Sequence, residues 1–275
     1  MCRLFGLSAA PRRVHVTFGP WDASDGTGLG VFTAGGKPVV DKQPSPACQD
    51  ALDAKERAST TFLAHVRHAS TGGLGPRNTH PFEQHGRLFA HNGVVGDLPR
   101  LETQLGDHRD LVAGDTDSER FFALTTKQID AHDGDVGAGI TAAARWLAEN
   151  LPVYAINLVL TTPTELWALR YPDTHELFLL RRAAGGPQGD RRLDHAGTSG
   201  HGHARSDALS EYPAVVVASE RMDDDPGWQP LRPGELLHVD DQLVCVRRII
   251  IDHPPRHLLP LRELDARTAT SRAAT

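Results

Sequence analysis

Two consecutive helical segments lie near the middle of a chain that otherwise reads as short strands, and this arrangement most limits the fold. Thr116 and Glu119 in TDSERFF have the spacing of a capping box, which predicts a helix from about 116 to 129. In DVGAGITAAARWLAENL, apolar residues recur at helical spacing and predict a second helix. These recurring residues are Val136, Ile140, Ala143, Leu147 and Leu151.

Strand patterns lie on both sides of this helical pair. LFGLSA, LGVFTA, KPVVDK and TFLAHVRHA precede it, and RLFAHNGVV is predicted to form strand–turn–strand. After Pro152, YAINLVLTT, ELWALRY and ELFLLRR predict a meander, and PAVVVASE and LLHVDDQLVCVRRIII predict further strands. A doubly wound parallel sheet would alternate strand and helix throughout, which this chain does not. The order therefore predicts an α+β layered sandwich.

Three further segments complete the predicted organisation. A polar, alanine-rich stretch predicts another helix at 47–59, and the Gly/Ser/Asp/His-rich stretch 183–211 predicts a mobile surface loop. The last two dozen residues are typical of a loose tail. We therefore expect one domain over residues 2–250, followed by a C-terminal tail over 251–275.

The charge balance excludes several classes of function. The net charge is −6, and no Lys/Arg block is present, which argues against a nucleic-acid partner. No apolar run approaches the roughly 20 residues that span a bilayer. No apolar stretch of signal-peptide length follows the early arginines, so we expect no signal peptide. We expect a cytoplasmic protein with no membrane partner.

The cysteines and histidines do not form a metal-binding pattern. Cys2, Cys48 and Cys245 are scattered and odd in number, which disfavours a disulfide framework or a zinc knuckle. The histidines of the 183–211 segment lack an acidic or cysteine partner at ligand spacing. They are His195, His201 and His203. We expect no metal and no cofactor.

Cys2 directly follows the initiator methionine. Removal of Met1 would give Cys2 both a thiol and a free α-amine. An α-amine has a pKa of about 7.7–8.0, so a fraction is the free base near neutral pH and can accept the thiol proton. The thiolate would then attack an amide or thioester carbonyl. The alternative is a small buried residue at the start of a strand.

Arg67, Asn92 and Gly93 each allow a structural and a functional interpretation. Arg67 near the end of a strand could clamp a carboxylate through two parallel hydrogen bonds, or form a surface ion pair. Asn-Gly between apolar strands indicates a hairpin turn. The same turn could direct the Asn92 amide and the Gly93 N–H to one point, as an oxyanion hole does.

Asp117 is predicted to lie in the first turn of the first helix. A carboxylate there complements the helix dipole, which contributes up to about 1 kcal/mol. The functional alternative is a carboxylate at the rim of a site, where it would meet a substrate ammonium group.

Cys2, the arginine strand, His-Asn-Gly and Thr-Asp-Ser-Glu occur here in one order. This ordered set resembles the class II glutamine amidotransferases, which are N-terminal-nucleophile hydrolases with a catalytic cysteine. The resemblance covers at least residues 2–120 and is expected to continue to about 250. It implies a four-layer αββα fold with two mainly antiparallel sheets between helix layers.

The resemblance also implies roles for single residues. Cys2 would be the nucleophile, Asn92 and Gly93 the oxyanion hole, and Arg67 the clamp for the glutamine α-carboxylate. Asp117 would meet the α-ammonium group. Ser70 keeps a hydroxyl in the substrate-binding segment, and His80 in NTHPF would have a structural role near the site.

The sequence also departs from the larger synthases of the family. These usually carry glycine where Arg3 follows the cysteine, and Arg-Trp-Ala-Thr-His-Gly where this chain has Arg67-His68-Ala69-Ser70-Thr71-Gly72. Both changes resemble a short, stand-alone branch that includes a γ-glutamyl hydrolase of ergothioneine biosynthesis. ASERMDDDPGW near residue 220 also resembles that branch.

The resemblance therefore predicts an enzyme that cleaves a γ-glutamyl amide through a Cys2 thioester and releases glutamate and an amine. One alternative is an ammonia-donating glutaminase subunit for a separate synthase. Another is a catalytically silent binding protein. The expected partner is a small γ-glutamyl compound or glutamine, and a homo-oligomer or a synthase partner stays open.

Overall fold

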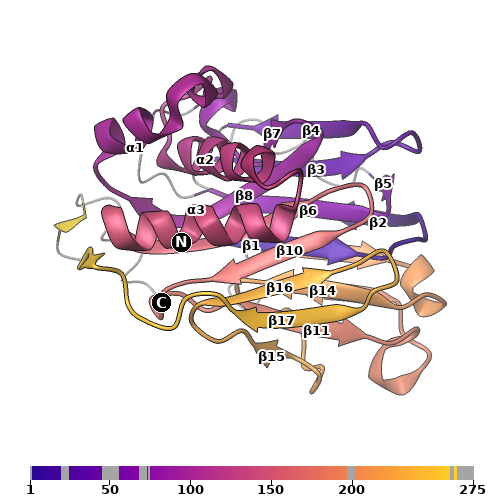
Figure 1. Cartoon of the computed structure of the whole chain (residues 1–275). Coiled ribbons are helices and arrows are strands. Elements are labelled where there is room, and N and C mark those ends of the chain that lie inside the picture. The colour runs from indigo at the N-terminus through magenta and orange to yellow at the C-terminus, as the bar shows by residue number, and fades with distance from the viewer. Residues whose placement is uncertain are drawn as a thin grey trace.

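The computed structural model describes residues 2–19, 25–44, 56–67, 73, 75–196, 202–260 and 263–264. Two large sheets are stacked face to face, and a group of helices covers the outer face of one of them (Figure 1). Every strand pair within these sheets is antiparallel except for one short pair near the C-terminus. The molecule is thus an α+β sandwich, as the order of predicted elements indicates.

The first sheet has seven strands and contains the N-terminal strand near its centre. In spatial order they are β15 (Gln229–Pro230), β11 (Phe178–Arg182), β14 (Ala214–Ala218), β1 (Arg3–Ser8), β6 (Thr61–Val66), β3 (Thr27–Phe32) and β4 (Pro38–Gln43).

The second sheet faces the first one. In spatial order its strands are β17 (Cys245–Ile249), β16 (Glu235–Val239), β10 (Leu166–Arg170), β9 (Pro152–Thr161), β8 (Arg87–Val95) and β7 (Phe82–Gln84), and β18 (His257–Leu258) runs parallel to β9. Leu4, Leu63, Ala90 and Val159 are among the buried residues that form the core between the two sheets.

Helices cover the outer face of the second sheet (Figure 1). They are α1 (Leu98–Leu105), α2 (Asp117–Ala131) and α3 (Val136–Asn150), with the 3₁₀ turn η3 (Gly106–Leu111) between α1 and α2. Thr116 is the N-cap of α2, and its hydroxyl accepts from the Glu119 N–H at 3.2 Å. Both predicted helices are confirmed. No helix in the described part of the chain has the length and apolarity to cross a membrane.

A small sheet covers the outer face of the first sheet. Its strands, in spatial order, are β12 (Leu193–Ala196), β13 (His203–Ser206), β2 (Val14–Phe18) and β5 (Glu56–Ser59). Short 3₁₀ turns lie at η2 (Pro76–Asn78), η4 (Gly186–Gln188) and η5 (Ala208–Ser210). Apolar residues of β2, β12 and β13 pack against β1, β6 and β14 in a separate core.

This small sheet corrects two predictions. Residues 56–59 of the expected 47–59 helix form β5, which pairs with β2, and residues 47–55 lie outside the described part. Ser59 is buried there and bonds to the Phe32 backbone, so tertiary pairing overrides the local helix preference. In the expected 183–211 loop, β12 and β13 pair with each other, while residues 197–201 are not described.

The expected meander after Pro152 is also only partly correct. β9 and β10 pair as neighbours, but β11 leaves the second sheet and pairs with β14 in the first. Leu177 and Leu179 enter the core between the sheets on this crossing. An apolar alternation in sequence specifies a buried strand face but does not say which sheet the strand joins.

Candidate active site

The predicted nucleophile and the predicted clamp lie on neighbouring strands of the first sheet. Arg3 in β1 is opposite Val66 in β6. The next pair outward in this register is Cys2 and Arg67. Cys2 is about nine-tenths buried, and the Arg67 side chain is 3% exposed. The sheet therefore places Cys2 beside a buried arginine residue.

Asn92 reaches the same point from the second sheet. Leu88 and Ala90 of β8 belong to the core between the sheets, and strand alternation places Asn92 on that face. Its Nδ2 donates to the Cys2 carbonyl oxygen at 3.2 Å. An amide nitrogen has two N–H donors, so the second remains for another acceptor. Asn92 Oδ1 is buried and has no hydrogen-bond partner among the described residues.

The His-Asn-Gly motif does not form the predicted turn. β8 runs without interruption from Arg87 to Val95, and Asn92 and Gly93 pair with Asn157 and Ile156 of β9. A Cβ on Gly93 would lie 1.8 Å from the Ala155 carbonyl oxygen. Glycine is thus required by a close backbone approach rather than by a turn.

Backbone groups hold Arg67 in place. Its N–H donates to the Gly26 carbonyl at 2.8 Å, and Nη1 donates to the Gly73 carbonyl at 3.3 Å. Asn78 Nδ2 donates to the same Gly73 oxygen at 3.1 Å. Asn78 Oδ1 also accepts from the Asp115 N–H at 2.8 Å, which ties this segment to the start of α2.

Asp117 is the first residue of α2 and is 1% exposed. Its Oδ2 accepts from the Val95 N–H at 2.8 Å, which joins the helix to the end of β8. Glu119 Oε2 accepts from the Gly114 N–H at 2.6 Å and fixes the approach to the helix. The carboxylate thus lies at a helix N-terminus. Its partner, Val95, is two residues beyond Gly93 in β8.

His80 is buried close enough to Arg67 for that charge to affect its pKa. Its ring is 4.2 Å from that of His65 between centroids, and both residues are buried. Burial, followed by the charges of His65, His91 and Arg67, holds the pKa of His80 well below its usual range. Neither ring nitrogen of His80 has a hydrogen-bond partner among the described residues. A neutral imidazole is the form that fits this packing.

Ser70, the remaining predicted substrate-binding residue, lies outside the described residues. The described ranges contain no group of three or more His, Cys, Asp or Glu side chains that could hold a metal ion.

A cleft of ≈ 620 Å³ opens beside the contact between Asn92 and Cys2. Its lining includes side chains that the sequence motifs do not mark as site residues: Arg3, His175, Phe178, Ser219, Glu220 and Arg221. Ser219 Oγ accepts from the Leu4 N–H at 2.9 Å, and Arg3 Nε pairs with Glu220 Oε1 at 3.2 Å. These contacts span more than 200 residues, and the only local signal was the ASERMDDDPGW stretch.

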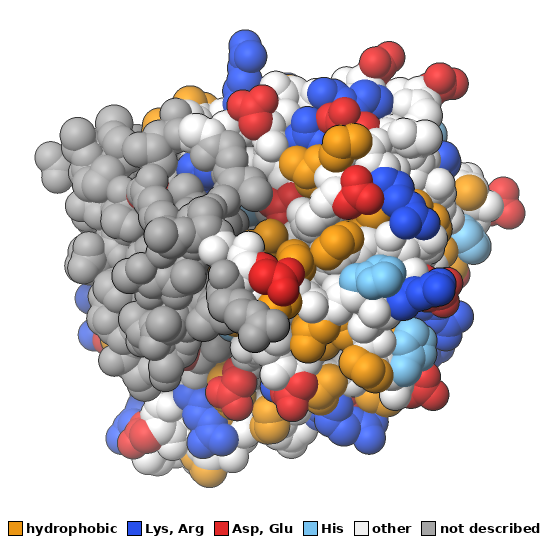
Figure 2. Space-filling view, turned by 90° about the vertical axis from the view of Figure 1, so that its left-hand side faces the viewer, with side chains coloured by type: hydrophobic (Ala, Val, Ile, Leu, Met, Phe, Trp, Pro, Cys, Tyr) orange, Lys and Arg blue, Asp and Glu red, His pale blue; other side chains and the backbone are white. Residues whose placement is uncertain are grey.

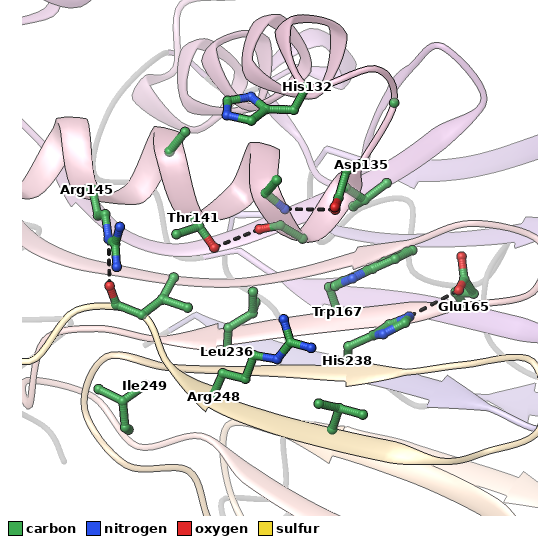
Figure 3. A pocket seen from close by; sticks show the side chains of 17 residues that line it. His132, Asp135, Thr141, Arg145, Glu165, Trp167, Leu236, His238, Arg248 and Ile249 are labelled. Atoms are coloured by element: carbon green, nitrogen blue, oxygen red, sulfur yellow. Dashed lines mark hydrogen bonds and ion pairs between the residues drawn. The ribbon is translucent and has the colours of Figure 1, made fainter.

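A larger hollow of ≈ 810 Å³ lies elsewhere, between the start of α3 and strands β10, β16 and β17 (Figure 3). Trp167 stacks on His238 there, and His238 pairs with Glu165 at 3.1 Å. None of the predicted site residues lines this hollow. Volume alone therefore does not locate the chemistry, and the candidate site rests on Cys2.

On the face that Figure 2 shows, the described charged side chains are not all of one sign. Acidic and basic side chains alternate there with hydrophobic ones over the described part. This pattern is unlike the basic stripe of a nucleic-acid-binding surface.

Comparisons with known proteins identify the family of the chain. The family model "Glutamine amidotransferases class-II" matches residues 1–255. YafJ of Escherichia coli (strain K12), which is named as a glutamine amidotransferase, is 27% identical over 260 residues, covering 86% of this chain and 96% of YafJ.

Two solved structures show the same fold. One is named as a glutamine amidotransferase from Pseudomonas aeruginosa PA01, with a TM-score of 0.63, 18% identity, and coverage of 86% of this chain and 96% of that one. The other is the glutamine phosphoribosylpyrophosphate amidotransferase from B. subtilis, with a TM-score of 0.58, 17% identity, and coverage of 93% and 50%. On the match of the family model to residues 1–255, the chain belongs to the class II glutamine amidotransferases.

Proposed function

We propose that the protein hydrolyses a γ-glutamyl amide through a thioester on Cys2. The observation that carries this proposal is the contact between Asn92 Nδ2 and the Cys2 carbonyl, with Arg67 one strand away. It places a thiol, an amide donor and a buried cation at one end of the paired sheets. Removal of Met1 would add the α-amine of Cys2.

The chemistry would proceed in two stages. The Cys2 α-amine takes the thiol proton, and Sγ forms a bond to the γ-carbonyl carbon of the substrate. Asn92 Nδ2 and the Gly93 N–H donate to the oxyanion that develops. The C–N bond then breaks, and the amine leaves with the proton from the α-amine.

Water completes the reaction. It adds to the thioester carbonyl and gives a proton to the α-amine. The C–S bond then breaks, glutamate leaves, and Sγ regains a proton.

Asn92 Oδ1, which has no partner among the described residues, belongs to the amide that already contacts Cys2. The α-amine released by Met1 removal can supply that missing donor.

Arg67 and Asp117 would recognise the amino-acid end of the substrate. One is cationic and the other anionic, and both are at least 97% buried near the ends of β6 and β8. Buried charges are held by groups of opposite sign and by hydrogen bonds, and a ligand of complementary charge can add to those already present. The α-carboxylate and α-ammonium groups of a γ-glutamyl compound provide both signs.

The decisive experiment is intact-mass analysis of the purified protein mixed with γ-glutamyl amides and quenched in acid. We expect active protein to lack Met1 and to carry a glutamyl adduct on Cys2, and Cys2→Ala to show neither adduct nor glutamate release. Full activity with Met1 still attached would refute the mechanism.

The same assay separates the alternative function. An ammonia-donating subunit should prefer glutamine, and a synthase partner should raise its turnover. A hydrolase should release glutamate faster from a larger γ-glutamyl amide when it acts alone.

A further inference from the structure

The hollow of ≈ 810 Å³ beside the start of α3 contains a buried donor without an acceptor. Trp167 is 4% exposed, and its indole N–H has no hydrogen-bond partner among the described residues. A buried indole N–H usually has a partner. Trp228 follows this rule, since it is also 4% exposed and its Nε1 donates to Asp223 Oδ1 at 2.6 Å. The N–H of Trp167 therefore remains available for an acceptor that enters the hollow.

Neighbouring groups fix the position of this indole. Its ring stacks on His238, with 4.8 Å between the ring centroids and 7° between the ring planes, and His238 Nε2 pairs with Glu165 Oε1 at 3.1 Å. Figure 3 shows the Trp167 ring beneath the start of α3. A Cβ on Gly137, in the first turn of this helix, would lie 3.9 Å from Trp167 Nε1. The glycine thus leaves the space beside the indole nitrogen open.

The strand register places Arg248 on the same face of the second sheet. Trp167 is opposite His238, and Arg248 is opposite Leu236, two residues before His238 in β16. All four side chains therefore lie on one face. With strands about 4.8 Å apart and same-face neighbours about 6.7 Å apart, the Cα atoms of Trp167 and Arg248 are about 12 Å apart. Arg248 points from β17 into the hollow (Figure 3), so the indole and the guanidinium can meet one ligand from two sides.

The basic groups of the hollow favour an anion. Arg248 has no ion-pair or hydrogen-bond partner among the described residues, so its donors remain for a ligand. Arg145 Nε donates to the Ile250 carbonyl at 2.8 Å, and its other N–H groups stay available. The first turn of α3 also lines the hollow, and the free N–H groups of a helix N-terminus add partial positive charge.

The two acids of the hollow are already engaged. Glu165 pairs with His238. Asp135 is the N-cap of α3, and its Oδ1 accepts from the Ala138 N–H at 2.9 Å. The partial positive charge of the helix N-terminus offsets the charge of this carboxylate. Neither acid therefore cancels the attraction of an anion to Arg248.

We propose that this hollow binds a small organic anion whose carboxylate or phosphate oxygens accept from Trp167 Nε1 and the Arg248 guanidinium. The apolar part of the molecule would pack on Leu236 and on Val246, which is 38% exposed on the same face. A volume of ≈ 810 Å³ lies within the range of about 300–1,000 Å³ that small-molecule sites occupy. This site is separate from Cys2 and does not depend on the proposed hydrolysis.

Nuclear magnetic resonance spectroscopy of the indole N–H groups of the four tryptophans tests this proposal at the atom concerned. Loss of one resonance in Trp167→Phe assigns it to Trp167. The probes are benzoate and phenyl phosphate, which carry the two kinds of anionic group on the same ring, and the neutral benzyl alcohol. The titrated proteins are the unmodified chain, Arg248→Ala, Gly137→Leu and Cys2→Ala. Arg192→Ala, at an exposed arginine outside the hollow, is the matched control.

We expect at least one of the two anions to shift the Trp167 resonance saturably and to bind more tightly than benzyl alcohol. The anion that binds more tightly identifies the acidic group. Arg248→Ala should raise its Kd about 10-fold, the size of one charge-assisted hydrogen bond. Gly137→Leu should also raise the Kd, because its side chain fills the space beside the indole nitrogen. Arg192→Ala and Cys2→Ala should leave the Kd unchanged.

Three results would overturn the inference. One is a Trp167 resonance that neither anion shifts, which would mean that only solvent meets the N–H. Another is benzyl alcohol binding at least as tightly as both anions, or a Kd that Arg248→Ala does not raise, since the charge would then contribute nothing. The third is loss of the shift in Cys2→Ala, which would place the anion in the cleft beside Cys2. The remaining indole resonances report whether each variant keeps its fold.

Discussion

At the scale of single residues, Arg67 and Asp117 are both charged and almost completely buried. Arg67 is 3% exposed and Asp117 is 1% exposed. Backbone groups meet both, with Gly73 O accepting from Arg67 and Val95 N–H donating to Asp117. Desolvated charges interact more strongly than exposed ones, so a ligand of complementary charge gains more here than on the surface.

Arg67→Lys should lower kcat/KM for γ-glutamyl substrates by roughly 10–100-fold, because lysine keeps the charge but loses the bidentate fork. Steady-state kinetics with one γ-glutamyl amide would measure this. Arg192→Lys, an exposed arginine that pairs with Asp194, serves as the control and should have no effect. An Arg67→Lys enzyme with unchanged kcat/KM would remove Arg67 from the site.

Asp117→Asn should weaken the binding of γ-glutamyl compounds more than the binding of analogues without the α-amine. The asparagine oxygen can still accept from the Val95 N–H, so the helix stays attached while the charge is lost. Competition assays with a matched pair of inhibitors would measure the difference. Equal losses for both inhibitors would mean that Asp117 serves only the start of α2.

His80 should make stability depend on pH. Its pKa is well below the usual value in the folded state, mainly through burial, so the unfolded chain binds the proton more readily. The stabilising contribution of neutral His80 is therefore complete above about pH 6.5 and falls as the pH drops below it, by up to about 1.4 kcal/mol per pH unit. Urea titrations between pH 7.5 and 5.5 would give the free energies of unfolding of the protein and of His80→Asn. The difference between these two free energies should shrink as the pH falls. Parallel curves would contradict this.

At the scale of elements, β8 carries the oxyanion-hole candidates because it is a continuous strand. Asn92 faces the first sheet and Cys2, whereas Gly93 lies against the β9 backbone. The ladder to β9 fixes both groups, and a ladder is more rigid than a hairpin turn at a loop tip.

Gly93→Ala should destabilise the protein by about 1–3 kcal/mol, because the new methyl group overlaps the Ala155 carbonyl. Chemical denaturation would measure this loss. Gly75→Ala is the matched control, since nothing lies within 4 Å of a Cβ at that glycine. A Gly93→Ala protein as stable as the control variant would show that β8 and β9 separate easily at this point.

At the scale of the whole molecule, the candidate site depends on the stacking of two sheets. β1 and β6 supply Cys2 and Arg67 from the first sheet, and β8 supplies Asn92 from the second. The apolar core between the sheets sets the distance between these groups. A looser core would therefore weaken the site without touching any of its residues.

Leu63→Ala should lower the free energy of unfolding by about 2–5 kcal/mol, because Leu63 is fully buried between the sheets and leaves a cavity. Thermal denaturation followed by circular dichroism would measure the change. Val39→Ala is the control, since Val39 is 40% exposed on β4, and it should change stability by less than about 0.5 kcal/mol.

Short sequence patterns are enough to predict α2, α3 and the family. The capping pair Thr116 and Glu119 marks the start of α2, and the helical spacing from Val136 marks α3. Both depend on contacts within a few residues, which a sequence pattern records directly. The ordered motifs likewise identify the family, which the family model confirms.

How these parts come together depends on contacts between residues that are distant in the sequence. Asn-Gly is a turn in most short contexts, but the ladder to β9 and the close approach of Ala155 make it part of a strand here. The fragment 56–59 and strand β11 also follow their partners rather than their own patterns. The contacts that form the cleft, Leu4 with Ser219 and Arg3 with Glu220, join residues more than 200 positions apart. Such pairings are selected by the packing of whole sheets, and no short stretch of sequence carries that information.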